Sequence, residues 1–152
     1  MSGDLRPDRP GALTVGLLRP CILAHLMDGD SVYGYELHHW LLGIGVECDL
    51  GTVYRSLNTM EAEGLLHSTW ERTAGGRSRR RYELSEPGRD MIDAYVAPVE
   101  QLRTVATEFL DMRKARESRS ASEVMEQRRQ AMLTRSSVED GPASMSIPAQ
   151  RG

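Results

Sequence analysis

A run of arginines without any acid is the most distinctive chemical feature of this 152-residue sequence. Positions 72–81 contain Arg72, Arg77, Arg79, Arg80 and Arg81, although the chain as a whole has a net charge of −3. Guanidinium groups bind phosphates and guanine edges, so such a stripe can bind a polyanion even on an acidic protein. The alternative interpretation is a solvated, charged hairpin without a ligand.

A capped amphipathic helix precedes this stripe. Asp49 is typical of an N-cap and Gly64 of the residue that ends a helix. Apolar residues recur between them at helical spacing: Leu50, Val53, Tyr54, Leu57 and Met60. The other face carries small and polar side chains: Thr52, Arg55, Ser56 and Asn58. A helix with this face fits the major groove of DNA, which is about 12 Å wide.

Individual residues of this helix suit different parts of DNA. Arg55 and Asn58 are of the types that bind guanine and adenine edges. Gly51 and Thr52 lie at the helix N-terminus, which attracts phosphate. Tyr54, like Tyr35, lies on an apolar stripe, and for both a core position is the alternative to a phosphate contact.

The periodicity changes to two after this helix. Residues 65–71 and 79–85 predict two antiparallel strands around a turn that contains Gly75 and Gly76. Two helices come earlier in the sequence. The first lies at about 18–28 and has Pro20 in its first turn. The second is capped by Asp30 or Ser31 and ends near 43–45. Three helices followed by a basic hairpin are the order of a winged helix-turn-helix domain. The arginines of the hairpin, including Arg77, Arg79 and Arg81, would contact phosphates or enter the minor groove.

A second amphipathic segment follows the hairpin, at residues 86–113. Its apolar residues alternate in steps of three and four: Ile92, Tyr95, Val99, Leu102, Ala106 and Phe109. Such a seam lacks a partner within so small a domain, so it predicts pairing with a second copy of the chain. Pro98 predicts a kink in this dimerisation helix.

The predicted class is α+β, mainly α, and the flanks are less regular. Residues 1–13 predict a flexible arm, 14–85 the winged-helix domain, and 114–152 a largely disordered segment. Within the last, Ser120 and Glu123 form a capping box that can begin a short helix at 120–133.

The sequence argues against several other classes of protein. Cys21 and Cys48 have no spacing typical of metal ligands, and the four histidines share no pattern with carboxylates. No nucleophile or phosphate-loop motif is present, so we expect no catalytic residue, no metal site, no cofactor and no enzyme activity. Apolar runs fall far short of the roughly 20 residues that cross a bilayer. We expect a cytoplasmic protein.

Six short segments together resemble the PadR-like transcriptional regulators: 20–24 (PCILA), 33–37 (YGYEL), 51–57 (GTVYRSL), 60–66 (MEAEGLL), 75–77 (GGR) and 81–85 (RYELS). The resemblance covers about residues 18–95. It implies a homodimeric repressor that binds an inverted-repeat operator in double-stranded DNA, with the helix after the wing at the dimer interface. It also implies that seven positions contact DNA: Tyr33, Gly34, Thr52, Tyr54, Arg55, Gly76 and Arg77.

Two departures from the family leave the effector open. Some relatives bind planar drugs between tryptophans of the dimerisation helix, but residues 86–112 contain no Trp, and Trp40 and Trp70 lie elsewhere. The segment from about 113 onward matches nothing in the family. An alternative function is therefore a protein-interaction module that recruits RNA polymerase or a sigma factor. The excess of Arg over Lys is typical of a GC-rich bacterial genome. We expect the protein to be associated with the nucleoid.

Overall fold

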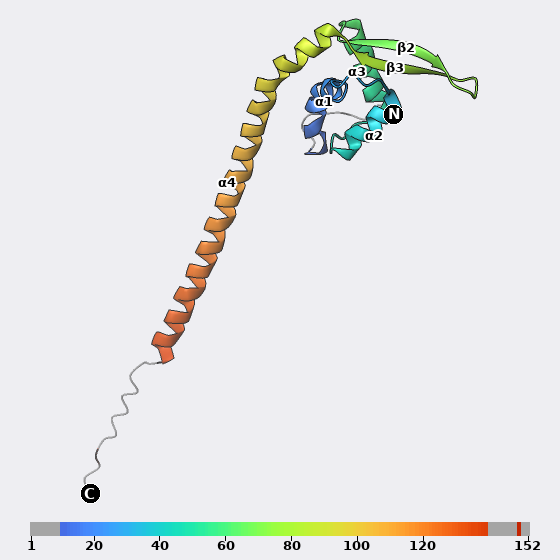
Figure 1. Ribbon diagram of the computed structural model, residues 1–152. Helices are drawn as coiled ribbons and strands as arrows, with labels where there is room; N and C mark the ends of the chain where they lie inside the picture. Colours follow the sequence, from blue (N-terminus) through green and yellow to red (C-terminus); the bar gives the residue numbers. More distant parts are fainter. Residues whose placement is uncertain (1–9, 140–148, 150–152) are drawn as a thin grey trace. The chain divides into compact units, whose positions relative to one another are not determined.

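A computed structural model describes residues 10–139 and residue 149 of the chain (Figure 1). The elements in order are the 3₁₀ helix η1 (Pro10–Leu17), α1 (Leu18–His25), β1 (Val32–Tyr33), α2 (Gly34–Gly43), α3 (Leu50–Ala62), β2 (Leu66–Arg72), β3 (Ser78–Leu84) and α4 (Glu86–Glu139). This is the predicted winged helix-turn-helix arrangement followed by a helix. Of the predicted arm 1–13, residues 1–9 lie outside the described residues, and Pro10 begins η1.

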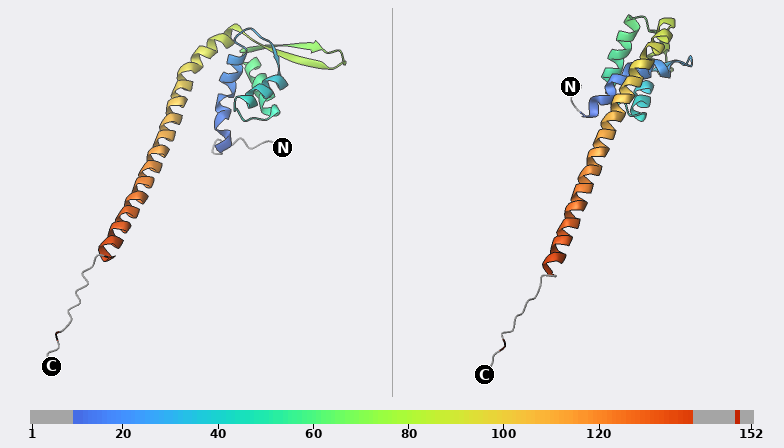
Figure 2. Two further views of the ribbon diagram at one scale, coloured as in Figure 1. Left: turned by 60° about the horizontal axis from the view of Figure 1, so that its bottom comes forward. Right: turned by 90° about the vertical axis from the view of Figure 1, so that its left-hand side faces the viewer.

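The core of the winged-helix domain is almost entirely aliphatic, as expected for a sequence with few aromatic residues. It joins buried side chains of α1, α2, α3 and the sheet: Leu18, Ile22, Leu23, Leu26, Val32, Leu37, Leu41, Val46, Val53, Leu57, Met60, Leu65, Leu66 and Tyr82. Figure 2 shows these three helices gathered beside the hairpin. The first turns of α4 complete the packing, since Met91, Ile92 and Tyr95 lie against this core.

The sheet contains one strand that the periodicity did not predict. Its order is β1-β3-β2, and both pairings are antiparallel. β1 pairs Val32 with Tyr82 and Tyr33 with Arg81. Because β1 uses residues 32–33, α2 begins later than predicted, with Tyr33 rather than Asp30 or Ser31 as its N-cap. The backbone N–H of Tyr33 donates to Glu36 of the first turn over 3.1 Å.

The ends of α3 confirm the predicted caps. The Asp49 carboxylate accepts a hydrogen bond of 2.6 Å from the backbone N–H of Thr52, which satisfies one free N–H of the first turn. The same hydrogen bond lowers the pKa of Asp49. Gly64 has a φ of 79°, a conformation that side chains disfavour and that lets the chain turn from α3 into β2.

Ser85 joins the end of α3 to the start of α4. Its buried hydroxyl donates to the carbonyl of Gly64 over 2.6 Å and accepts the backbone N–H of Gly88 over 3.0 Å. The backbone N–H of Ser85 donates to the carbonyl of Leu65 over 3.1 Å. These three hydrogen bonds connect the end of α3, the start of the wing and the first turn of α4 through Ser85.

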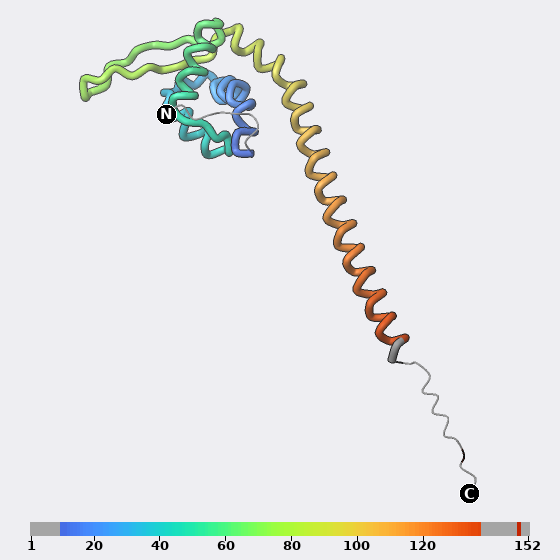
Figure 3. The backbone as a smooth tube through the Cα atoms, turned by 180° about the vertical axis from the view of Figure 1, so that it is seen from behind, coloured from blue at the N-terminus to red at the C-terminus, as the bar shows by residue number. Residues whose placement is uncertain are grey.

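α4 is longer and more continuous than predicted. It runs without interruption through Pro98 to Glu139, a length of 54 residues, instead of ending near 113 (Figure 3). The predicted capping box at Ser120 and Glu123 is therefore inside a helix and begins none. The rest of the predicted disordered segment, 140–152, lies outside the described residues except for residue 149.

The continuity of α4 has a physical explanation. No glycine or proline occurs between Val99 and Glu139, and helix-forming charged residues are frequent. The hydroxyl side chains within the helix are accommodated by bonding to the carbonyl four residues earlier, for example Thr107 to Arg103 and Ser122 to Ser118, each over 2.9 Å. Pro98 lies inside the helix, where it removes one backbone N–H donor and crowds the carbonyl four residues earlier, and the kink expected there stays a prediction. The chain divides into two compact units at residue 102, within this helix.

Replacing Gly88 by alanine should destabilise the domain. A Cβ at Gly88 would lie 2.2 Å from the Leu65 carbonyl oxygen and 2.7 Å from a methyl carbon of Leu84. We expect Gly88→Ala to lower the free energy of unfolding by about 1–3 kcal/mol, as overpacking does. Gly75→Ala is the control, because nothing lies within 4 Å of its Cβ. Urea denaturation measures both, and equal stabilities would contradict this role of Gly88.

Candidate nucleic-acid interface

The exposed face of α3 differs from the predicted one at Leu50, Thr52 and Tyr54. Arg55 and Asn58 are exposed as predicted, and Tyr54 is 37% exposed instead of lying in the core. Thr52, however, is buried, with 7% of its surface exposed. Its hydroxyl accepts a hydrogen bond of 3.0 Å from the Arg55 guanidinium. The structure thus corrects the predicted exposure of Thr52, whose side chain holds Arg55, while its contact with DNA stays a prediction.

Two tyrosines and an arginine form a stack where α2 begins. The rings of Tyr33 and Tyr35 are parallel to within 5°, with centroids 5.8 Å apart. The Arg79 guanidinium carbon lies 5.6 Å from each ring centroid, and Arg79 donates to the Tyr35 hydroxyl over 3.2 Å. Tyr35 is 45% exposed, which contradicts a core position. No acid pairs with Arg79 among the described residues, so its charge remains available to an anion.

Arg81 is neutralised by an acid within the hairpin. Its guanidinium donates to the Glu71 carboxylate over 3.0 Å, and the Tyr33 hydroxyl donates to the same carboxylate over 2.6 Å. The hydrogen bond from Tyr33, together with Arg81, holds the pKa of Glu71 below its ordinary value. Arg81 was predicted to contact phosphate, but the ion pair makes it a weaker anion-binding group than its sequence position suggests.

Arg80 points to the opposite face of the hairpin and is also paired with an acid. Its guanidinium donates to Ser68 over 2.9 Å, to Asn58 over 3.2 Å and to the Glu61 carboxylate. Ser68 also donates to Glu61. We call Arg80, Asn58, Glu61 and Ser68 the Arg80 cluster. It ties the hairpin to α3.

The tip of the hairpin presents arginines that have no partner. The tight turn is closed by Thr73, which donates to the Arg77 carbonyl through its N–H over 3.0 Å and its hydroxyl over 2.9 Å. Gly76 takes a φ of 80°. Arg72 and Arg77 are exposed, and their guanidinium groups make no hydrogen bond or ion pair with any residue the structure describes. They are the arginines best placed to meet a phosphate.

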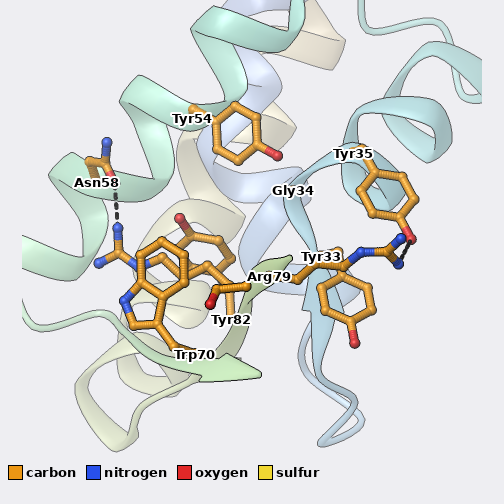
Figure 4. Close-up of a pocket in the computed structure, with 10 residues that line it drawn as sticks. Tyr33, Gly34, Tyr35, Tyr54, Asn58, Trp70, Arg79 and Tyr82 are labelled. Carbon is orange, nitrogen blue, oxygen red and sulfur yellow. Dashed lines mark hydrogen bonds between the residues drawn. The ribbon is translucent and has the colours of Figure 1, made fainter. Parts of the chain in front are cut away.

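A cavity of about 380 Å³ lies between α3, the start of α2 and the hairpin (Figure 4). Five predicted site residues line it: Tyr33, Gly34, Tyr54, Asn58 and Arg79. Gly34 is required there, because a Cβ would come within 2.4 Å of the Tyr54 ring. Five further lining residues were not predicted to belong to the site: Tyr35, Trp70, Ser78, Arg80 and Tyr82.

The sequence contained a signal for three of the five lining residues that were not predicted. Trp70, Arg80 and Tyr82 fall on one face of the hairpin once the strands are paired, and that face lies against α3. The alternation of residues in the second strand was visible in the sequence, but the register with the first strand was not. The other seven predicted residues do not line the cavity: Gly51, Thr52, Arg55, Ser56, Gly76, Arg77 and Arg81.

The described residues offer little for other chemistry. They contain no group of three or more metal-ligating side chains, and none of their helices is long and apolar enough to cross a membrane. Cys21 and Cys48 are half-buried free thiols, and burial raises the pKa of each.

Comparisons with known proteins agree with this geometry. The family model for the transcriptional regulator PadR-like family matches residues 22–94. A PadR family transcriptional regulator from Eggerthella lenta is 26% identical, with a TM-score of 0.56 over 64% of this chain and 85% of that one. A PadR-like transcriptional regulator from Bacillus cereus is 26% identical, with a TM-score of 0.54 over 64% and 95%.

A third solved structure shares the fold at lower identity. It is a putative transcriptional regulator from Thermoplasma acidophilum, 21% identical, with a TM-score of 0.60 over 65% of this chain and 95% of that one. Nearly the whole of these regulators is thus covered, whereas about a third of this chain lies outside each match. A search of curated proteins gave no match.

Replacing Glu71 by glutamine should weaken the fold in a pH-dependent way. The contacts with Tyr33 and Arg81 favour the charged carboxylate, so they stabilise the fold above the ordinary pKa of 4.5 and are lost as the pH falls through the lower folded value. We expect the melting temperature of Glu71→Gln to lie below that of the wild type at pH 7 and to approach it below about pH 4.5.

The matched control is Glu83→Gln on the neighbouring strand, whose exposed carboxylate makes no hydrogen bond or ion pair with the described residues. It should leave the melting temperature nearly unchanged at both pH values. A Glu71→Gln deficit that stays constant into acid would contradict the proposed cause.

Proposed function

We propose that this chain, whose residues 22–94 belong to the transcriptional regulator PadR-like family, is a homodimeric repressor that binds an inverted-repeat operator in double-stranded DNA. The observation that carries the proposal is the common cavity: Tyr54 and Asn58 of α3 border the same space as Arg79 of the hairpin and Gly34 at the start of α2. A reading helix and unpaired positive charge therefore lie on one side of the domain, where one duplex can meet both.

Different residues would bind different parts of the duplex. Arg55 and Asn58 would face base edges in the major groove, while the exposed N-terminal turn at Gly51 would approach a phosphate. Arg77 and Arg79 would bind phosphates or enter the minor groove. Ser56, half-buried, and Arg81, paired with Glu71, would contribute less. Such a protein acts where chromosomal DNA lies, in the cytoplasm of a bacterium.

The dimer would be formed by the seam of α4. Ile92 and Tyr95 are half-buried against the core, but Leu102 is 46% exposed and Phe109 63% exposed. Val99 and Ala106 lie between them at seam positions. Beyond the residues that pack on the core, apolar side chains repeated at this spacing pack well in the seam of a second helix. A second copy of the same helix supplies one and matches the two-fold symmetry of an inverted repeat.

Selection of bound sequences from random DNA tests the main proposal. The purified protein should recover an inverted repeat with half-site centres about 10 base pairs apart, one turn of the duplex. Recovery of no common sequence, or of an asymmetric single site, would contradict it.

The same operator separates base contacts from phosphate contacts. Arg55→Ala should cost about 1–3 kcal/mol of binding free energy and relax the preference at one base pair. Arg77→Ala should weaken binding to operator and random DNA alike and reduce the salt slope by about 1 per contact. Fluorescence anisotropy titrations at several salt concentrations measure both. If Arg55→Ala weakens both DNAs equally, Arg55 is a phosphate contact only.

A double variant tests the seam. Leu102→Ala combined with Phe109→Ala should yield monomers that keep the winged-helix fold, because truncating a buried Leu or Phe typically costs about 2–5 kcal/mol. The control is Met132→Ala combined with Leu133→Ala, which removes two exposed apolar groups, 73% and 59% exposed, from the same helix outside the seam. Analytical ultracentrifugation should find that the control remains dimeric. The reverse result would place the interface at the C-terminal half of α4.

A further inference from the structure

We infer that Arg80 is a positioning residue that fixes the orientation of the Asn58 amide, so that Asn58 donates hydrogen bonds to a base edge rich in acceptors, with guanine preferred over adenine. The inference rests on the proposed binding of DNA through α3. It names a specificity-determining pair of residues, one on α3 and one on β3, of which the sequence indicated only Asn58.

Arg80 is held from all sides by the protein. Its Nε donates to the Ser68 hydroxyl over 2.9 Å, its Nη1 to the Asn58 Oδ1 over 3.2 Å, and its Nη2 to the Glu61 carboxylate. Its guanidinium carbon also lies 5.6 Å from the ring centroid of Trp70 and 5.4 Å from that of Tyr82. Every nitrogen of the guanidinium therefore has a partner, and both rings are suitably placed for cation–π attraction.

The ion pair with Glu61 removes Arg80 from the charges that a phosphate would find. The two side chains are 30% and 26% exposed, so solvent screens the pair less than at an open surface. Breaking it to reach a phosphate would leave the Glu61 carboxylate without its cation, close to the DNA. Arg77 at the tip has no acidic partner among the described residues, so it can bind a phosphate without breaking an ion pair. The two arginines, three positions apart in one basic stripe, thus have different roles.

The bond to Asn58 determines which end of the amide is offered to DNA. An amide whose oxygen and nitrogen are both free of other partners can bind adenine with the two atoms together. Here the oxygen is turned towards Arg80, and Figure 4 shows the amide nitrogen on the side away from the dashed bond. Flipping the amide would place its two N–H groups against a guanidinium that can only donate. The orientation is therefore set, and the N–H groups face away from the hairpin.

An outward amide nitrogen favours some bases over others. In the major groove guanine offers two acceptors, N7 and O6, whereas adenine offers one acceptor beside a donor. The Asn58 amide N–H can donate to either acceptor of guanine. On adenine only N7 accepts, and the neighbouring N6 amino group is itself a donor. We expect guanine to be favoured over adenine by about tenfold or more at the base pair read by Asn58.

Selection from random DNA by a set of variants tests this. Asn58→Ala identifies the base pair, because the preference there should disappear. At that base pair, Arg80→Met should reduce the preference for guanine over adenine to less than about threefold, since the freed amide can then bind adenine as well. The double variant Glu61→Gln with Arg80→Met removes both charges of the ion pair and should give the same shift, which covers the case in which Arg80→Met alone does not fold.

Arg79→Met is the matched control, because Arg79 is the neighbouring residue on β3 and contacts Tyr33 and Tyr35, not Asn58. It should weaken binding to all sequences and leave the base preference unchanged.

Three outcomes would overturn the inference while leaving the proposed DNA binding intact. The first is an adenine preference at the Asn58 position in the wild type. The second is an unchanged base preference in both Arg80 variants. The third is a uniform loss of affinity with a salt slope lower by about 1 in Arg80→Met, which is the behaviour of a phosphate contact. Failure of the wild type to enrich any sequence would instead count against the proposed function, and with it the inference.

Discussion

The central position of β3 in the sheet is the constraint on which the interface depends. β3 pairs with β1 on one side and with β2 on the other, so it joins the start of α2 to the strand that follows α3. Because side chains alternate along a strand, neighbouring arginines go to opposite faces. Arg79 and Arg81 reach the tyrosines of β1 and α2, whereas Arg80 reaches α3. A one-residue shift in register would exchange these contacts and separate Arg80 from Asn58.

The arginines of the hairpin consequently differ in what they can bind. Glu61 and Glu71 neutralise Arg80 and Arg81, while Arg72 and Arg77 at the tip have no acidic partner among the described residues. The two acids come from α3 and β2, and each also accepts a hydrogen bond from a hydroxyl, from Ser68 and Tyr33 respectively. On the proposed binding of DNA, the charge of Arg80 beside α3 would position Asn58, whereas the free charge at the tip would only need to attract the DNA backbone.

Local signals determined how much of this could be predicted from the sequence. The caps of α3, three buried residues of its apolar face (Val53, Leu57 and Met60) and the hairpin follow from residue types within a few positions of each other, and those predictions are confirmed. Leu50 and Tyr54 of the same predicted face are exposed. β1 has only two residues, and its existence depends on pairing with Tyr82 and Arg81, some 50 positions later. The burial of Thr52 depends equally on tertiary context, because its helical position is compatible with either environment. The Arg80 cluster required the register of two strands, which periodicity alone does not supply.

The length of α4 was mispredicted for a different reason. Its C-terminal half lacks an apolar period, and its polar composition predicts disorder. Helix propensity and pairs such as Arg113 with Glu117, 2.9 Å apart, nevertheless support a helix there. Such local terms are individually small, and a helix in a protein gains most of its stability from packing against other elements. Val105, Phe109 and Met112 are each more than half exposed within the single chain. The N-terminal turns of α4 are anchored by Ser85, Met91 and Ile92, whereas its later apolar residues have no partner among the described residues. This contrast is the physical reason to assign a second copy of the chain to the seam.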